Sequence, residues 1–367
     1  MTAATTRLAS LDVFRGITVA GMVLVNNPGT WSAVYPPLRH ADWHGWTPTD
    51  LIFPFFVFIV GVAIPFSLAG RAGGADAALP RVLRRALLIF ALGIVLNGFP
   101  WFHWATLRIP GVLQRIAISY LVAALVYLAT GWRGQAVWAA ALLLGYWALM
   151  TLVPVPGHGA GDLGKEWNLA AYLDRALLGS AHMWRVAKVF DPEGILSTVP
   201  AVATALAGVL TGQWLRSGRA PAALARGLAW AGVAALAIGW LWGLAFPINK
   251  SLWTSSYVVF TAGWALLVLA FCYWLIDVRG VGGWGVPFVI FGVNALALYF
   301  LSTLMAKLFV LIHVDEPPRL LQAWLFTHGF APWAAPVNAS LAYALTYLAL
   351  WWAIMWALFR AGIRIRV

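Results

Sequence analysis

Apolar segments separated by short polar connections follow one another along almost the whole chain. From Leu11 onward, predominantly apolar stretches of roughly 20 residues recur, each long enough to cross a hydrocarbon core about 30 Å thick. A transmembrane barrel would instead show alternating segments of about 10 residues. The pattern predicts an all-α polytopic membrane protein, a bundle of about ten transmembrane helices. Their expected positions are approximately 11–27, 50–70, 84–101, 110–130, 134–152, 194–215, 224–246, 252–276, 284–312 and 337–360.

The composition agrees with this class. Hydrophobic residues make up 62% of the 367 residues and charged residues only 10%, whereas soluble globular proteins carry about 25% charged residues. The 23 tryptophans suit two interfacial belts at the membrane surfaces. We expect a single domain over residues 1–367. An outward-facing loop at about 153–193 should hold one short helix, in "LAAYLDRALLG".

A net charge of +12 would suggest nucleic-acid binding in a soluble protein, but here the membrane explains it. Most basic residues flank the predicted spans, as the positive-inside rule expects, so we expect no nucleic-acid partner. Arginines concentrate in the short loops of one side, which predicts that both termini are cytoplasmic. Cys272 stands alone and cannot form an intrachain disulfide, and residues 1–10 show no cleavable signal. The arginines of the cytoplasmic side are Arg7, Arg71, Arg81, Arg84, Arg85, Arg133, Arg216, Arg219, Arg226, Arg279, Arg360, Arg364 and Arg366.

The connection "RHADWHGWTPTD", residues 39–50, is unusually rich in proton-transfer chemistry. Histidine titrates near physiological pH, which suits it to general acid–base catalysis. Asp42 and Asp50 are both candidates to fix a histidine tautomer and stabilise its charged form. Asp50 has an alternative role in the first turn of the next span, behind a threonine cap. The residue pattern alone does not choose between His40 and His44.

Two further clusters place ionisable groups at or within spans, where they are costly and usually functional. In "SLDVFRG", Asp12 and Arg15 are three residues apart and can pair on one helix face. The pair is either a structural anchor or a site where Arg15 helps to hold an anionic cytoplasmic ligand. In "RIPGVLQRIAISY", Arg115 lies inside an apolar segment beside Gln114. Arg115 either pairs with a buried aspartate or binds a phosphate or carbonyl group in a cavity.

The last cluster gathers polar residues expected on the outer side, in "FDPEGILS" and "FPINKSLWTSSY", together with Asn294 inside a span. Asp191 and Glu193 precede a predicted helix and can simply cap its N-terminus. Lys250 can be a plain interfacial anchor. The chain shows no metal-ligand spacing, Walker A loop, GxGxxG or GxSxG motif, so we expect no metal, ATP or dinucleotide chemistry.

Six blocks of the sequence occur in a distinctive order. They are "RLASLDVFRGITVAGMVLVNNPG", "HADWHGWTPTDLIFPFFVFIVGVAI", "RIPGVLQRIAISYL", "FDPEGIL", "FPINKSLWTSSYV" and "PFVIFGVNALALY". Together they resemble the heparan-α-glucosaminide N-acetyltransferase family and its bacterial relatives, from about Arg7 to the C-terminus. The resemblance implies a transmembrane acyltransferase fold in a bacterial inner membrane. It implies transfer of acetyl groups from cytoplasmic acetyl-CoA to the amino group of a glucosamine-type sugar at the outer face. We expect the chain to lack the N-terminal lumenal domain of the lysosomal enzyme.

The resemblance also implies roles for residues. The family's pattern His-Ala-x-Trp-x-Gly-x-Thr begins here at His40, which makes His40 the expected catalytic histidine and leaves His44 at a variable position. The expected catalytic residues are His40, Asn26 and Asp50. The expected acetyl-CoA contacts are Arg15, Gln114, Arg115 and Asn294, and the expected acceptor contacts are Glu193, Asn249, Lys250 and Trp253.

His40 is expected to deprotonate the acceptor amine for direct transfer, and an acetylated His40 is the alternative route. Two rival functions stay open: an O-acyltransferase acting on cell-envelope glycans or lipids, and a transporter for amino sugars. The expected partners are acetyl-CoA, an amino-sugar acceptor and membrane lipids, and a homodimer is left open.

Overall fold

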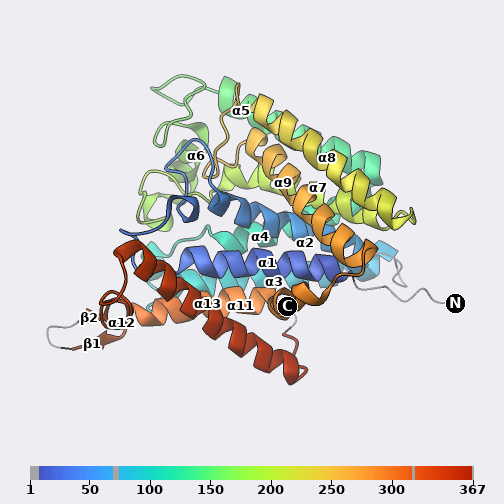
Figure 1. Cartoon of the computed structure of the whole chain (residues 1–367). Coiled ribbons are helices and arrows are strands. Elements are labelled where there is room, and N and C mark those ends of the chain that lie inside the picture. The colour runs from blue at the N-terminus through green and yellow to red at the C-terminus, as the bar shows by residue number, and fades with distance from the viewer. Residues whose placement is uncertain (1–7, 69–73, 316–318, 366–367) are drawn as a thin grey trace. The chain divides into compact units, whose positions relative to one another are not determined.

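The computed structural model describes residues 8–68, 74–315 and 319–365 (Figure 1), and side chains from residue 77 in the second of these ranges. This part of the chain is almost entirely helical, with one two-stranded antiparallel pair. The helices are α1 Ala9–Asn26, α2 Ile52–Leu68, α3 Gly74–Gly98, α4 Val112–Ala129, α5 Trp132–Leu152, α6 Leu169–Leu178, α7 Ile195–Leu215, α8 Pro221–Trp242, α9 Ser255–Tyr273, α10 Val286–Val293, α11 Ala295–Phe309, α12 Leu321–Gly329 and α13 Pro336–Arg360. The strands are β1 His313–Val314 and β2 Arg319–Leu320.

The predicted fold class is confirmed: the protein is an all-α, multi-pass membrane protein. Eight helices of the described chain are long and apolar enough to cross a membrane. The bent pair Gly283–Val293 and Ala295–Phe309, with an angle of 68°, makes a ninth if it is one span. The remaining predicted span, 84–101, falls largely in α3, which is helical but carries Arg81, Arg84 and Arg85. The end of the second predicted span, at 69–70, lies outside the described residues, as do Arg7, Arg71 and Arg366.

The described chain forms two compact units. The first unit contains Asp42–Gly45 and most of Pro54–Phe271, and therefore the bulk of α2 and of α9 and all of α3 to α8. The second contains residues 8–41, Trp46–Phe53 and residues from 272 onward, and therefore α1 and α10 to α13. The connection of residues 39–50 contributes to both units, which divides its two histidines between them.

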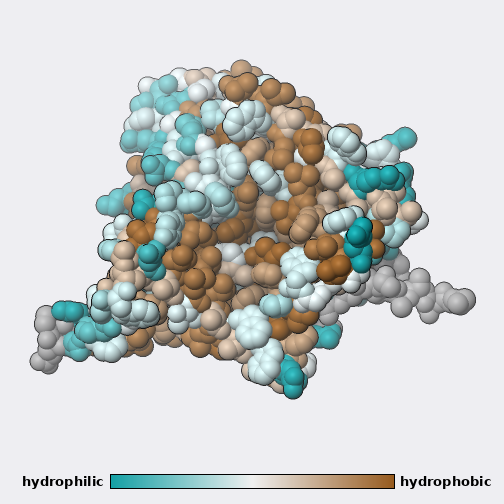
Figure 2. Space-filling view, viewed as in Figure 1, coloured by the Kyte–Doolittle hydropathy of each residue, from teal (hydrophilic) through white to brown (hydrophobic). Residues whose placement is uncertain are grey.

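Helices of the first unit approach one another closely where glycine removes a side chain. A Cβ atom at Gly61 of α2 would overlap the carbonyl oxygen of Ala205 on α7, and one at Gly208 would overlap that of Phe58. Small residues serve the same purpose in many membrane helix pairs, because lipid offers no hydrophobic drive for association. The outward faces stay apolar: Trp230 and Leu241 of α8 are largely exposed, and Figure 2 shows hydrophobic side chains over much of the visible surface.

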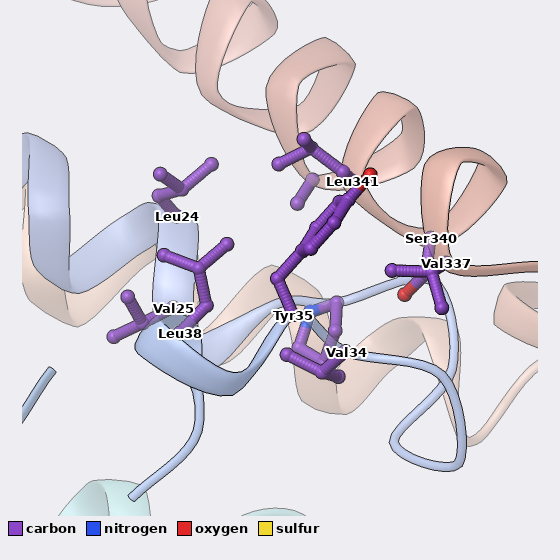
Figure 3. Close-up of a pocket in the computed structure, with 10 residues that line it drawn as sticks. Leu24, Val25, Val34, Tyr35, Leu38, Val337, Ser340 and Leu341 are labelled. Atoms are coloured by element: carbon purple, nitrogen blue, oxygen red, sulfur yellow. The ribbon is translucent and has the colours of Figure 1, made fainter. Parts of the chain in front are cut away.

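In the second unit, α1 packs against α10, α11 and α13. A Cβ atom at Gly16 would overlap the backbone of Phe288. The segment that follows α1 is held against α13, because Gly29 N–H donates to the carbonyl of Ser340 at 3.2 Å. A small apolar cavity of about 10 Å³ lies beside this segment, where Tyr35 points toward α13 near Leu341 (Figure 3). These contacts fix the chain that leads to His40.

Candidate functional site

His40 and Asp50 form a histidine–carboxylate pair in the second unit. The His40 Nδ1 atom lies 2.7 Å from Asp50 Oδ1. The Asp50 side chain is 1% exposed, whereas that of His40 is 42% exposed. A carboxylate accepts hydrogen bonds, so the pair places the imidazole proton on Nδ1 and the lone pair on Nε2. The accessible ring can therefore accept a proton from a substrate, which is what a general base requires.

Asp50 is held by the turn in which it lies. Its Oδ2 atom accepts hydrogen bonds from the backbone N–H of Ala41 at 3.0 Å and of Thr47 at 3.0 Å. The Thr47 hydroxyl lies 3.2 Å from the same oxygen and donates its proton to the carbonyl of Arg39 at 2.6 Å. Thr47 is the N-cap of the 3₁₀ turn Pro48–Leu51 that leads into α2, and Asp50 sits in its first turn. The two roles foreseen for Asp50, helix-terminus carboxylate and histidine partner, are thus filled together.

The second histidine of the connection meets an amide instead of a carboxylate. In the first unit, His44 Nδ1 lies 3.3 Å from Asn249 Nδ2. Partial burial lowers the pKa of His44 below its ordinary value. Neighbouring backbone is fixed in the same unit, since Gly45 N–H donates to the carbonyl of Ile248 at 2.8 Å. Partial burial therefore favours the neutral form of His44, and its ring is held by Asn249.

Three expected site residues of the second unit lie on α1 or at the α10–α11 break. Asn26 is the last residue of α1 and is exposed. Arg15 pairs with Asp12, Nη1 to Oδ1, at 3.2 Å, so the pairing predicted from their spacing is confirmed. Asn294 stands between α10 and α11, where it donates to the carbonyl of Ile363 at 3.2 Å and accepts from Ile365 N–H at 2.9 Å. Asn294 thus binds the chain's own C-terminal segment.

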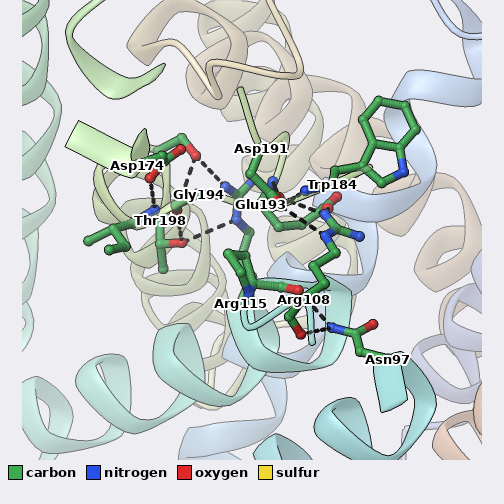
Figure 4. Close-up of polar contacts among 12 residues, drawn as sticks. Asn97, Arg108, Arg115, Asp174, Trp184, Asp191, Glu193, Gly194 and Thr198 are labelled. Atoms are coloured by element: carbon green, nitrogen blue, oxygen red, sulfur yellow. Dashed lines mark hydrogen bonds and ion pairs between the residues drawn. The ribbon is translucent and has the colours of Figure 1, made fainter. Parts of the chain in front are cut away.

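A charged cluster of the first unit lies where α3 ends and where α4 and α7 begin (Figure 4). Arg108 forms ion pairs with Asp191 at 2.6 Å and with Glu193. Burial disfavours the charged form of Arg108, but the hydrogen bonds and charges of the two carboxylates outweigh it and raise its pKa above the ordinary value. The carboxylates of Asp191 and Glu193 therefore form ion pairs with Arg108. The prediction that these two residues cap the N-terminus of α7 is wrong.

The cap of α7 is a residue that the sequence did not single out. Asp174 of α6 accepts a hydrogen bond from Ile195 N–H at 2.8 Å. Burial raises the pKa of Asp174 to about 7. A Cβ atom at the preceding Gly194 would overlap this carboxylate. The available signal was a lone aspartate inside the apolar pattern of "LAAYLDRALLG".

Arg115 is 1% exposed in the first turn of α4. Its Nη2 atom donates to the hydroxyl of Ser197, and its Nε atom lies 3.4 Å from that of Thr198. The guanidinium stands 4.8 Å from the ring centre of Trp253. No aspartate is hydrogen-bonded to it in the described chain, so the predicted alternative of an aspartate pair is wrong.

Arg115, Gln114 and Glu193 line a cavity of about 430 Å³ in the first unit. Two expected acceptor contacts of the same unit are occupied by internal contacts: Asn249 is fully buried, and Trp253 is fully buried with its indole N–H donating to Thr204 at 3.1 Å. Trp253 also has a φ of 52°, which is strained for a bulky residue. Lys250 is partly buried beside them.

The comparisons with known proteins cover most of the chain. The family model "Heparan-alpha-glucosaminide N-acetyltransferase, catalytic" matches residues 7–243. The chain belongs to this family. It is 33% identical over 353 residues to heparan-alpha-glucosaminide N-acetyltransferase of Homo sapiens, covering 80% of this chain and 52% of that protein. It is 31% identical over 353 residues to the Mus musculus protein of the same name, covering 80% and 53%.

This member of the heparan-alpha-glucosaminide N-acetyltransferase family spans about half the length of the curated relatives it matches. The family match includes the His40–Asp50 pair and the Arg115 cavity, and it ends before Asn249 and Asn294. The predicted resemblance is confirmed, and the chain is a member of a membrane acyltransferase family.

Proposed function

We propose that this protein transfers an acetyl group from acetyl-CoA to the amino group of a glucosamine-type sugar. The observation that carries the proposal is the His40–Asp50 pair, in which a buried carboxylate orients an accessible imidazole. Family membership supports the reaction class. Asn26, exposed at the end of α1 in the same unit, is proposed to donate a hydrogen bond to the oxyanion that forms at the thioester carbon.

The proposed mechanism follows from the protonation state of His40. The amine attacks only in its neutral form; the new N–C bond gives a tetrahedral oxyanion, and the thioester C–S bond breaks when this oxyanion collapses. His40 Nε2 accepts the proton that the attacking nitrogen loses, and Asp50 stabilises the resulting imidazolium. His40 then returns this proton to the sulfur of the departing CoA. Direct transfer of this kind needs no acetylated enzyme.

The proposed donor contact is Arg15, which lies near the N-terminus of α1 and is partly exposed. Guanidinium groups bind phosphate oxygens with paired hydrogen bonds, and its present partner Asp12 is three residues away on the same helix face. We propose that both termini are cytoplasmic, so that Arg15 meets the nucleotide there and His40 meets the sugar at the outer face. The arginine-rich loops support this orientation.

The experiment that tests the function is a transfer assay. Purified protein in proteoliposomes is incubated with radiolabelled acetyl-CoA and a panel of acceptors that differ in one group: glucosamine, N-acetylglucosamine and glucose. Label should appear on glucosamine and should depend on His40. Label on the hydroxyl-only sugar in place of the amine would overturn N-acetylation in favour of O-acylation, and failure to label any of the three would overturn amino-sugar transfer.

A further inference from the structure

The backbone on both sides of His40 is hydrogen-bonded to the turn that carries Asp50. The carbonyl of Arg39, which belongs to the peptide unit before His40, accepts a hydrogen bond from the Thr47 hydroxyl at 2.6 Å. The N–H of Ala41, which belongs to the peptide unit after His40, donates to Asp50 Oδ2 at 3.0 Å. All of these residues belong to the second unit. Each of the two peptide planes that meet at His40 is therefore tied to the same turn.

Thr47 also contacts the carboxylate that pairs with His40. Its backbone N–H donates to Asp50 Oδ2 at 3.0 Å, and its hydroxyl oxygen lies 3.2 Å from the same atom. A hydroxyl carries a single proton, and this proton is donated to the carbonyl of Arg39. Thr47 therefore joins the peptide unit before the histidine to the carboxylate that orients the imidazole ring.

The His40 ring needs these ties because packing does not hold it. The side chain of His40 is 42% exposed. Peptide units are planar, and only φ and ψ of His40 separate the two that meet there. Two fixed planes therefore set the direction in which the side chain leaves the backbone. Without the hydroxyl of Thr47, the plane before His40 is free to turn, and the direction of Nε2 is no longer set.

The segment before the histidine is folded by bonds that do not involve Thr47. The N–H of Arg39 donates to the carbonyl of Pro36 at 3.2 Å. The hydroxyl of Thr49, from the same turn as Thr47, donates to the carbonyl of Pro37 at 3.0 Å. The loss of the Thr47 hydroxyl therefore releases one peptide unit and leaves the rest of the segment in place.

We propose that Thr47 is a positioning residue for His40, whose hydroxyl holds the preceding peptide unit so that Nε2 points at the acceptor amine. The inference rests on the proposed acetyl transfer, in which His40 Nε2 takes the proton of that amine. Proton transfer of this kind is sensitive to placement, since an error of about 1 Å can lower a rate about 10²-fold. In this role Thr47 acts on the reaction only through His40.

Four variants separate positioning from a structural role. Thr47→Val removes the hydroxyl and keeps the shape of the side chain and the backbone N–H that binds Asp50. Thr47→Ala repeats the deletion with a smaller side chain, and Thr47→Ser restores the hydroxyl. Thr49→Val is the matched control, because it removes the other hydroxyl that joins the two segments. Thr49 is 3% exposed, whereas the bond from Thr47 to Arg39 is open to solvent.

Each variant is assayed in proteoliposomes for glucosamine acetylation, and its thermal unfolding is measured on the same preparation. Thr47→Val and Thr47→Ala should lose about 10–100-fold in kcat, with the KM for acetyl-CoA within about twofold of the wild type. Thr47→Ser should keep a kcat within about threefold of the wild type. Thr49→Val should also stay within about threefold. Its Tm should fall at least as much as that of Thr47→Val, because its hydroxyl is more deeply buried.

The decisive measurement repeats Thr47→Val in the His40→Ala background. If Thr47 acts through His40, the added substitution should change the residual rate by less than about twofold. A role in the general stability of the site would instead lower the residual rate by the same factor as in the wild type.

Three outcomes would overturn the inference in an active wild type. They are a kcat of Thr47→Val within about threefold of the wild type, an equal loss in Thr47→Ser, and a further loss of about tenfold or more in the His40→Ala background. A wild type that acetylates none of the acceptors would refute the proposed function itself, and the inference would fall with it. The two failures are therefore distinguished by the wild-type measurement.

Discussion

Replacing Asp50 by asparagine tests the proposed base more sharply than removing the histidine. The substitution keeps the size and shape of a side chain that is 1% exposed. It removes the negative charge and turns one acceptor oxygen into an NH₂ donor. His40 itself stays in place, so a loss of activity in the folded variant reports on its protonation and not on its absence.

The hydrogen bonds around Asp50 fix how the asparagine must sit. Oδ2 accepts from two backbone N–H groups, and an NH₂ group there would face two donors. The amide oxygen must therefore take the Oδ2 position, which turns the NH₂ toward His40 Nδ1. Nδ1 then becomes the acceptor, and the ring proton moves to Nε2. The base that the mechanism needs is lost.

The expected rate loss is about 10³–10⁴-fold in kcat, the range seen when a histidine base is held in the wrong tautomer. Stability should fall by about 1–3 kcal/mol, because hydrogen bonds to a charged acceptor become bonds to a neutral one. The KM for acetyl-CoA should change little, since the proposed nucleotide contact at Arg15 is on α1.

The assay measures glucosamine acetylation and thermal unfolding of the same preparations. Asp42→Asn is the matched control, because Asp42 is an exposed aspartate of the same connection. A kcat of Asp50→Asn within about threefold of the wild type would refute the role of the pair. A loss that tracks unfolding in both variants would show that Asp50 is needed for the fold and not for the chemistry.

Three further predictions concern single residues. His40→Ala should lose about 10²–10⁴-fold in rate and His44→Ala far less; enzyme quenched after acetyl-CoA alone should show no acetyl adduct on His40 by mass spectrometry, and a stoichiometric adduct discharged by glucosamine would refute direct transfer. Arg15→Ala should weaken acetyl-CoA binding about tenfold in calorimetry, as expected for one lost phosphate contact, and an unchanged affinity would remove Arg15 from the donor site. Asp174, with its pKa raised to about 7 by burial from about 3.9 in the unfolded chain, binds a proton on folding between these values. Its contribution to stability is therefore present below pH of about 4 and is lost as the pH rises through 7; Asp174→Asn should flatten the pH dependence of Tm over this range, and an equal effect of exposed Asp162→Asn would contradict it.

The membrane spans and the Asp12–Arg15 pair could be predicted from the sequence because they rest on local rules. A long run of apolar residues must either cross the membrane or be buried in the protein. A spacing of three residues places two side chains on the same face of a helix. The start of the predicted span 84–101 could not be located from the sequence. The helix α3 begins ten residues before position 84, and its arginines lie within the helix and not in a flanking loop. The break at Asn294 has no local signal, since it depends on contacts with the C-terminal segment.

The partners of charged residues could not be predicted, because they come from distant parts of the chain. Arg115 was expected to need an aspartate, but it bonds hydroxyls of Ser197 and Thr198, more than eighty positions later. Hydroxyl groups are too common in a sequence to mark a partner. Asp191 lies just before α7, so a capping role was predicted for it. Its side chain instead pairs with Arg108, which precedes α4 in the chain. The backbone N–H at the start of α7 donates to Asp174.

The choice between His40 and His44, which the residue pattern left open, follows from their partners. Asn249 Oδ1 accepts from Leu252 N–H at 2.9 Å, so the amide must present its NH₂ group to His44 Nδ1. That contact makes Nδ1 an acceptor and places the ring proton on Nε2, the reverse of the tautomer that Asp50 imposes on His40. An amide also cannot stabilise the imidazolium that forms when a base takes a proton, whereas a buried carboxylate can. His44 is thus held in the form that cannot work as a base through Nε2, and His40 in the form that can.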